Sequence, residues 1–168
     1  MDHELLLRVR AGDREAFDLI VAARAESIHR TALAVLGNEA DARDAAQDAF
    51  VAAWRGIRGL RDVDRFDAWL GRILINQCRS ALRRRGRVRE VGMDLALETP
   101  VADAAYDSAD FDDAFARLTV DQRAILVLHH LHGYGVREIA DWLGIPVGTV
   151  KWRLSRARNA LHQELDRS

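Results

Sequence analysis

Residues 136–158 read VREIADWLGIPVGTVKWRLSRAR, and this stretch decides the fold of the C-terminal part of the chain. Apolar residues recur at helical spacing on both sides of a tight turn, which predicts two helices. Gly144 permits the left-handed backbone that the turn needs, small Ala140 lets the helices approach closely, and Pro146 suits the first position of the second helix. The pattern predicts a helix-turn-helix held together by four inward-facing apolar residues: Ile139, Leu143, Val150 and Leu154.

The second of these helices is basic on its predicted outer side. A helix-turn-helix places the early part of its second helix in the major groove of DNA. Arginine can hold a guanine edge there through two hydrogen bonds, and any cation can hold a phosphate. The alternative is an ordinary surface helix whose charges are solvated. We predict DNA binding through the residues on or near the solvent side, which are Thr149, Lys151, Trp152, Arg153, Ser155 and Arg156.

Helical spacing also dominates the N-terminal part of the chain, and no segment alternates with the two-residue period of a strand, so we expect an all-α fold. Gly12 and the pair Gly37-Asn38 are stop signals, and Asp13 is a helix cap. Trp54, Phe66 and Trp69 are spaced among leucines and isoleucines, which favours core packing over stacking on bases. The expected segments are a short helix before Gly12, helices over 13–36, 39–57 and 65–86, and a polar loop over 58–64.

Charge divides the chain into three parts. Residues 1–85 carry 15 basic and 13 acidic side chains, residues 86–114 carry 2 and 8, and residues 115–168 carry 8 and 5. The middle part also loses helical periodicity and contains Pro100, which is typical of a flexible linker. We therefore predict two small helical domains, over 1–86 and 111–168, joined by an acidic linker over 87–110.

Composition excludes several classes of protein. The single cysteine, Cys78, excludes a disulfide framework and a multi-cysteine metal site, and a packed side chain is favoured over a redox role. The N-terminus lacks a secretion signal and no apolar run approaches membrane-spanning length, so we expect a cytoplasmic protein. No catalytic motif occurs, so an enzyme is the least favoured interpretation, with no cofactor and no small-molecule substrate. Three histidines without a completing ligand favour helix-end cations over a metal site: His129, His130 and His132.

Two further surfaces are predicted in the first 86 residues. Asp44, Gln47 and Asp48 share one helix face, which suits a basic partner, although an isolated stripe of this kind is more often simply solvated. The second surface combines positive charge for phosphates with an amide for a base edge, a combination that suits unstacked single-stranded DNA. Its residues are Leu60, Arg61 and Asp62 in the loop and Arg72, Asn76, Arg79, Ser80 and Arg83 on the next helix.

The chain resembles the extracytoplasmic-function group of bacterial sigma factors. In the N-terminal part the matching patterns lie at 41–50, which reads DARDAAQDAF, and at 69–76, which reads WLGRILIN. In the C-terminal part they lie at 118–123, which reads LTVDQR, and at 138–158. The chain departs from the family pattern at Arg43 and Asp48, where Glu is usual, at Thr119, where Pro is usual, and at Trp152, where a small residue is common.

This resemblance implies a role for each surface. Asp44, Gln47 and Asp48 would dock on the clamp helices of the largest subunit of core RNA polymerase. The loop and stripe from Leu60 to Ser80 would capture the melted minus-ten promoter element, including a flipped base. Lys151, Trp152, Arg153 and Arg156 would read the minus-thirty-five element as duplex. The acidic linker would thread the RNA path of the polymerase, and an anti-sigma protein is an expected partner.

Two other interpretations of the residues stay open. A stand-alone transcription regulator with the same helix-turn-helix would bind duplex DNA as a dimer, and it would not occupy the sigma site of core polymerase. An anti-sigma-like or scaffold protein would leave the basic second helix unexplained.

Overall fold

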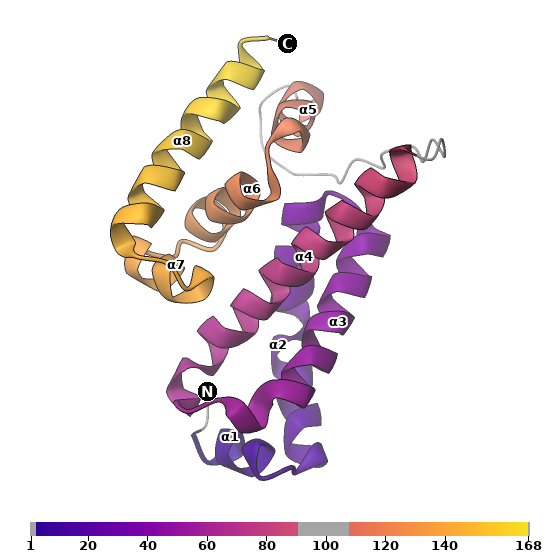
Figure 1. Cartoon of the computed structure of the whole chain (residues 1–168), viewed down its shortest axis with the longest axis vertical. Helices are drawn as coiled ribbons and strands as arrows, with labels where there is room; N and C mark the ends of the chain where they lie inside the picture. Colours follow the sequence, from indigo (N-terminus) through magenta and orange to yellow (C-terminus); the bar gives the residue numbers. More distant parts are fainter. Residues whose placement is uncertain (1–2, 91–107, 168) are drawn as a thin grey trace.

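The computed structural model describes residues 3–90 and 108–167, with side chains for 3–85 and 109–167. All regular secondary structure in these ranges is helical, so the predicted all-α fold is confirmed. Two 3-10 turns lie between α3 and α4, and a short π-helical turn follows α6 (Figure 1). The elements are α1 (His3–Arg10), α2 (Arg14–Leu36), α3 (Glu39–Gly56), η1 (Ile57–Gly59), η2 (Val63–Arg65), α4 (Phe66–Glu90), α5 (Ser108–Arg117), α6 (Val120–Leu126), η3 (Val127–Leu131), α7 (Val136–Leu143) and α8 (Val147–Leu165).

The N-terminal domain is a bundle in which α2, α3 and α4 lie side by side and α1 covers one end (Figure 1). The predicted signals set the helix ends. The Asp13 side chain accepts a hydrogen bond from the backbone N–H of Ala16, and Gly37 ends α2 with a φ of 67°. The aromatic residues predicted for the core pack there: Phe66 is fully buried, and Trp54 and Trp69 pack against the core at its edge.

Several helix ends differ from those expected. Helix α4 continues through Gly86 to Glu90, because one glycine costs only about 1 kcal/mol relative to alanine and arginines on both sides are good helix formers. Helix α5 begins at Ser108, inside the segment predicted as a linker, and the rest of that segment, 91–107, lies outside the described residues. The predicted polar loop over 58–64 contains parts of two 3-10 turns, η1 and η2.

The C-terminal domain contains the predicted helix-turn-helix. Helix α7 ends at Leu143, directly before the predicted turn, and Gly144 follows it with a φ of 66°. Pro146 lies one position earlier than predicted, because its extended ψ of 147° makes it the N-cap of α8. Of the four residues expected to hold the two helices together, Leu143 is half-buried and the other three are buried, namely Ile139, Val150 and Leu154.

The two domains pack against each other. Helix α7 contacts α4, and α6 contacts α2 and α4, so that α4 lies between α3 on one side and the C-terminal domain on the other (Figure 1). Ala124 and Val127 of the C-terminal domain belong to the same apolar cluster as the N-terminal core. Within the two described ranges, no helix combines the length and the apolar character needed to cross a lipid bilayer.

Candidate nucleic-acid interface

The residues predicted to read duplex DNA lie on the first half of α8, and we call them the recognition surface: Thr149, Lys151, Trp152, Arg153 and Arg156. Lys151, Trp152 and Arg156 are exposed, while Thr149 and Arg153 are partly buried. The indole of Trp152 is 57% exposed, which is unusual for so large an apolar side chain. Packing of Val150 and Leu154 against α7 fixes the rotation of α8, so this surface is held in one orientation by the helix-turn-helix core.

An open hollow adjoins the recognition surface between α8 and η3. Its polar lining includes Lys151, Ser155, Arg158 and His129. The Nε of Arg158 donates a hydrogen bond to Nε2 of His130 at 3.3 Å. Burial, together with neighbouring His129 and Arg158, lowers the pKa of His130, so its ring is neutral at pH 7 and can accept this bond. The hollow is therefore lined by two cations, Lys151 and Arg158, and by the hydroxyl of Ser155.

The three clustered histidines have separate partners. The ring of His129 contacts the carbonyl of Tyr134 at 3.0 Å, and His130 accepts from Arg158. His132 hydrogen-bonds across the domain boundary to the hydroxyl of Thr31 at 2.9 Å. Among the residues with described side chains, no group of three or more histidine, cysteine, aspartate or glutamate side chains is arranged to hold a metal ion.

The predicted basic stripe of α4 is only partly open to solvent. Arg79 donates to the carboxylate of Asp121 at 2.7 Å and to the amide oxygen of Asn76 at 2.6 Å. Arg72 donates to the backbone carbonyl of Asp141 at 3.3 Å. Asp121 and Asp141 belong to the C-terminal domain, so part of this stripe lies against the other domain, while Arg72 and Asn76 remain exposed. Further along α4, the guanidinium of Arg83 donates a hydrogen bond to the hydroxyl of Ser80 at 2.8 Å.

The loop before α4 presents the other residues predicted for single-stranded DNA. Arg61 and Asp62 are exposed and Leu60 is half-buried against the N-terminal core. The Asp62 side chain accepts a hydrogen bond from the backbone N–H of Asp64 and so caps η2. The Asp62 carboxylate therefore stabilises the loop in addition to facing solvent. The loop directly precedes α4.

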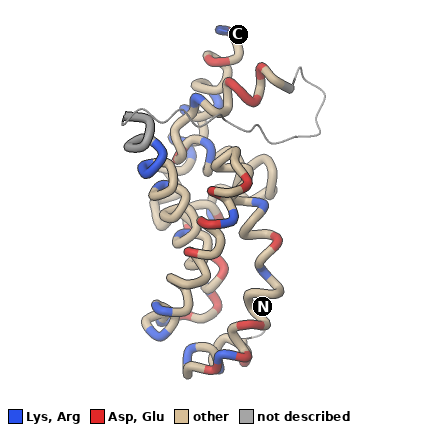
Figure 2. Tube along the Cα trace, turned by 90° about the vertical axis from the view of Figure 1, so that its right-hand side faces the viewer, with Lys and Arg blue, Asp and Glu red and all other residues tan. Residues whose placement is uncertain are grey.

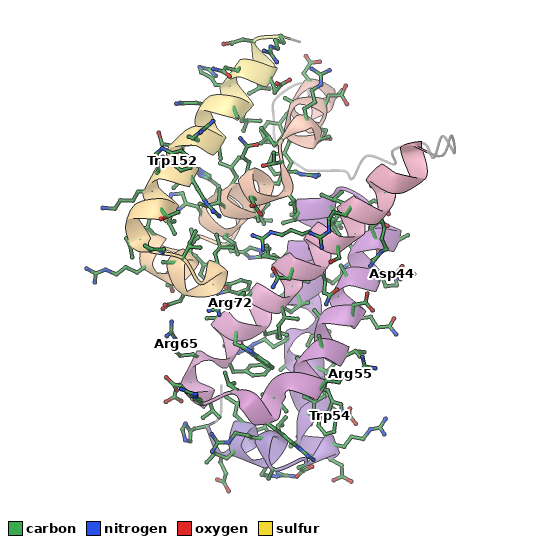
Figure 3. The ribbon with its side chains drawn as sticks, in the orientation of Figure 1. Asp44, Trp54, Arg55, Arg65, Arg72 and Trp152 are labelled. Atoms are coloured by element: carbon green, nitrogen blue, oxygen red, sulfur yellow. The ribbon has the colours of Figure 1, made fainter. Side chains whose placement is uncertain are left out.

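The acidic stripe of α3 faces away from the C-terminal domain. Asp44, Gln47 and Asp48 are all exposed. Figure 3 shows Asp44 on one side of the molecule and Trp152 on the other, with α4 between them. A partner bound to the acidic stripe would therefore leave the recognition surface free.

Sequence reasoning missed the residues that join the domains. Trp142, Asp141 and Asp121 were given no role, and each contacts a residue that lies far away in sequence. Arg123, also given no role, is buried on α6. Helical periodicity reports which face of a helix is apolar but not which distant helix covers it. The prediction that Cys78 is a packed side chain is confirmed, because it is fully buried.

Charge is spread over the molecule. Figure 2 shows basic and acidic positions interspersed along both domains. The formal net charge of the whole chain is −1.

Comparison with known proteins supports both domains. The family described as Sigma-70 region 2 matches residues 20–88, and the family described as Sigma-70, region 4 matches residues 108–161. The chain is 38% identical over 163 residues to the ECF RNA polymerase sigma factor SigM of Mycobacterium tuberculosis, covering 95% of this chain and 82% of that protein. It is 32% identical over 181 residues to the RNA polymerase sigma-H factor of Pseudomonas aeruginosa, covering 98% and 93% of the two chains.

Two solved structures have a similar arrangement. CnrH, in complex with the cytosolic domain of CnrY, superposes with a TM-score of 0.71 at 30% identity, covering 99% of this chain and 98% of that one. The sigma factor RpoE from Bartonella quintana, in complex with the anti-sigma factor NepR, superposes with a TM-score of 0.69 at 28% identity, covering 89% and 96%.

Proposed function

Since the chain belongs to the extracytoplasmic-function group of the sigma-70 family, whose members act in transcription initiation by RNA polymerase, we propose that it directs core polymerase to promoters by recognising two DNA elements in two forms. The C-terminal domain reads the minus-thirty-five element as duplex, and the N-terminal domain captures the melted minus-ten element. The polymerase makes the bonds, and this chain supplies recognition.

The observation that carries this proposal is the recognition surface of α8. Lys151, Trp152 and Arg156 are exposed on the second helix of a helix-turn-helix, which is the part that enters the major groove in this motif. Arg156 is suited to a guanine edge and Lys151 to a backbone phosphate. The hollow beside them, with Arg158 and Ser155, is suited to a further phosphate of the same duplex. Thr149 and Arg153 are partly buried and are assigned to the edges of the contact.

For the minus-ten element we propose the loop residues Leu60, Arg61 and Asp62 together with Arg72, Asn76, Arg79 and Ser80 on α4. Single-stranded DNA is bound through cations on its backbone and pockets for unstacked bases. Binding of only the melted state shifts the equilibrium between closed and open promoter towards the open form.

For the polymerase we propose that Asp44, Gln47 and Asp48 dock on the clamp helices of the largest subunit. All three are exposed on one face of α3 and lie away from the recognition surface. The acidic segment over 87–110, most of which lies outside the described residues, would follow the RNA path of the polymerase. The described complexes of CnrH and RpoE each contain a bound partner protein, and we propose an anti-sigma partner for this chain as well.

The direct test is run-off transcription with core RNA polymerase, with and without this chain, on a library of genomic fragments. A promoter-selective set of transcripts that requires the chain is the expected result. The variant Asp44→Ala/Asp48→Ala should lower affinity for core polymerase, while Asp18→Ala, an exposed acidic position on α2, should not. Failure of the unmodified chain to bind core polymerase, or to select any promoter, would refute the proposal.

A further inference from the structure

The hollow between η3 and α8 is lined by two cations, Lys151 and Arg158, and by the polar side chains of Ser155, Asn159 and His129. Its volume is about 390 Å³. A water molecule occupies roughly 30 Å³ in the liquid, so a phosphate group with some of its own water fits there. Among the side chains that the structure describes, neither Lys151 nor Arg158 forms an ion pair. Two cations around one hollow without a counter-ion attract an anion.

The ring of His129 has one defined proton position while it is neutral. Its Nδ1 lies 3.0 Å from the carbonyl oxygen of Tyr134. A carbonyl oxygen only accepts hydrogen bonds, so Nδ1 carries the proton and donates it. The other ring nitrogen, Nε2, has no proton in the neutral ring and becomes a donor when the ring is protonated. His129 therefore adds a positive charge and a hydrogen-bond donor to the hollow only in its protonated form.

The next residue, His130, controls one of the two cations. Nε2 of neutral His130 accepts a hydrogen bond from Nε of Arg158 at 3.3 Å. A protonated imidazole has two donors and no acceptor, so it repels the guanidinium instead of holding it. The ring centres of His129 and His130 lie 4.8 Å apart. Burial first, and then His129 and Arg158, lower the pKa of His130, and a bound anion would oppose these effects. Protonation of His130 thus releases Arg158 and adds charge beside the hollow.

The charged groups around the two rings do not cancel this effect. The elements that lie against η3 are α2, α6, α7 and α8. The carboxylate of Asp121 on α6 pairs with Arg79 at 2.7 Å, and that of Glu138 on α7 accepts a hydrogen bond from the backbone N–H of Gly135 at 2.7 Å. Both acids therefore already have partners within the protein. The other charges that act on the histidines of this segment or line the hollow are cations, namely Arg30, Lys151 and Arg158.

We propose that the hollow binds a phosphate group and that His129 and His130 make this binding stronger as pH falls. Lys151 and Arg158 supply the charge, and the hydroxyl of Ser155 donates a hydrogen bond. An anion in the hollow favours protonation of both rings, and by thermodynamic reciprocity protonation of the rings favours the anion. The phosphate belongs either to a DNA backbone or to a free phosphorylated ligand. The first source rests on the proposed function of α8, whereas the site itself does not.

Inorganic sulfate is the probe, because it has the shape of phosphate and keeps its charge near neutral pH. Sulfate is added to the isotope-labelled full chain, and chloride at equal ionic strength is the reference. We expect the amide signals of His129, Ser155 and Arg158 in NMR spectra to shift and to reach saturation. Arg158→Gln should weaken sulfate binding about three- to tenfold, because a charge-assisted contact in an open hollow is lost. Arg55→Gln makes the same change in charge at an exposed position on α3, away from α8, and is the matched control (Figure 3).

The same titration at pH 8 and at pH 5.5 tests the two histidines. Sulfate should bind about two- to fivefold more tightly at the lower pH, because protonated rings add partly exposed charges to the site. His129→Asn/His130→Asn should remove most of this rise, since asparagine still donates at 129 and still accepts at 130 but does not titrate. His3→Asn/His29→Asn, in the N-terminal domain, is the matched control. Circular dichroism at both pH values establishes that each variant is folded.

A fluorescein-labelled DNA duplex of mixed sequence, followed by anisotropy at low salt, separates the two sources of phosphate. If duplex and sulfate depend alike on Arg158 and on the two histidines, the site takes a phosphate of the DNA backbone. If sulfate alone depends on them, the site takes a free phosphorylated ligand. Both results support the site.

Sulfate shifts that are equally strong in Arg158→Gln and Arg55→Gln, or that do not saturate, would overturn the site. A rise in affinity at low pH that persists in the His129/His130 variant would overturn the role of the rings. None of these measurements contains polymerase, so run-off transcription decides the proposed function separately.

Discussion

The guanidinium carbon of Arg156 lies 4.9 Å from the centre of the Trp152 indole, one helical turn earlier on α8. Residues four apart are neighbours on a helix surface, and an arginine over an indole face gains about 0.5–1 kcal/mol at an exposed site. The stacking restricts the long arginine side chain before any DNA is bound. Trp152 therefore supports the side chain of Arg156 on the surface of α8.

Arg156→Ala should weaken binding to the promoter duplex by about 1–3 kcal/mol, because a guanine held through two hydrogen bonds would be lost. The measurement is fluorescence anisotropy with a promoter duplex identified by run-off mapping, using core polymerase with this chain bound. A scrambled duplex is the reference. Equal weakening on both duplexes would instead identify Arg156 as a phosphate contact.

Trp152→Ala should weaken promoter binding by about 0.5–1 kcal/mol through the lost stacking, while Trp152→Phe should retain most of the affinity because phenylalanine keeps an aromatic face. Neither substitution changes charge, so the salt dependence of binding should stay the same. The dependence is measured by repeating the titration over a range of salt concentrations. A loss that is equally large with phenylalanine would show that the indole contacts DNA itself rather than supporting Arg156.

The N-terminal core gives a prediction on stability. Leu74 is 0% exposed on α4 and packs within the bundle. Leu74→Ala should lower the free energy of unfolding by about 2–5 kcal/mol, the usual cost of a leucine-sized cavity in a packed core. Leu19→Ala, at a position 58% exposed, should change it by less than about 0.5 kcal/mol. Urea unfolding followed by circular dichroism measures both, and similar losses in the two variants would contradict the assigned core.

Local signals in the sequence predicted the elements well. Residues within a few positions of each feature predict the cap at Asp13 and the helix ends at Gly37 and Gly144. The same holds for the exposed side of α8, because the apolar positions Val150 and Leu154 define its inner side. Such features depend on backbone preference and helical period, which a single sequence carries.

The contact between the domains could not be predicted in this way. Gly71 and Trp142 are ordinary residues in their own helices, and only their approach in space gives the glycine a role. Likewise Arg72 and Arg79 have the same sequence pattern whether they face water, DNA or another domain. The groups that pair with these two arginines, Asp121 and Asp141, are ordinary polar residues in sequence.

The hydrogen bond between His132 and Thr31 makes the domain contact sensitive to pH. Burial, and then the charge of Arg30, lower the pKa of His132 below its ordinary value of 6.5. The unfolded chain then binds the proton more readily than the folded chain, so the folded state is favoured above pH 6.5 and its stability falls as pH falls through the lowered pKa.

The free energy of unfolding should therefore fall between pH 8 and pH 5.5, and His132→Gln should reduce that fall, because glutamine can hydrogen-bond to Thr31 without titrating. Urea unfolding at the two pH values measures the effect. His130, whose pKa is also lowered, mainly by burial, contributes in the same direction, so His130→Gln/His132→Gln should reduce the fall further. His3→Gln is the control, since His3 is exposed and contacts Asp64 within the N-terminal domain. A pH dependence unaltered by glutamine at 132 would mean that the imidazole stays neutral through this range or that its protonation does not oppose the packing.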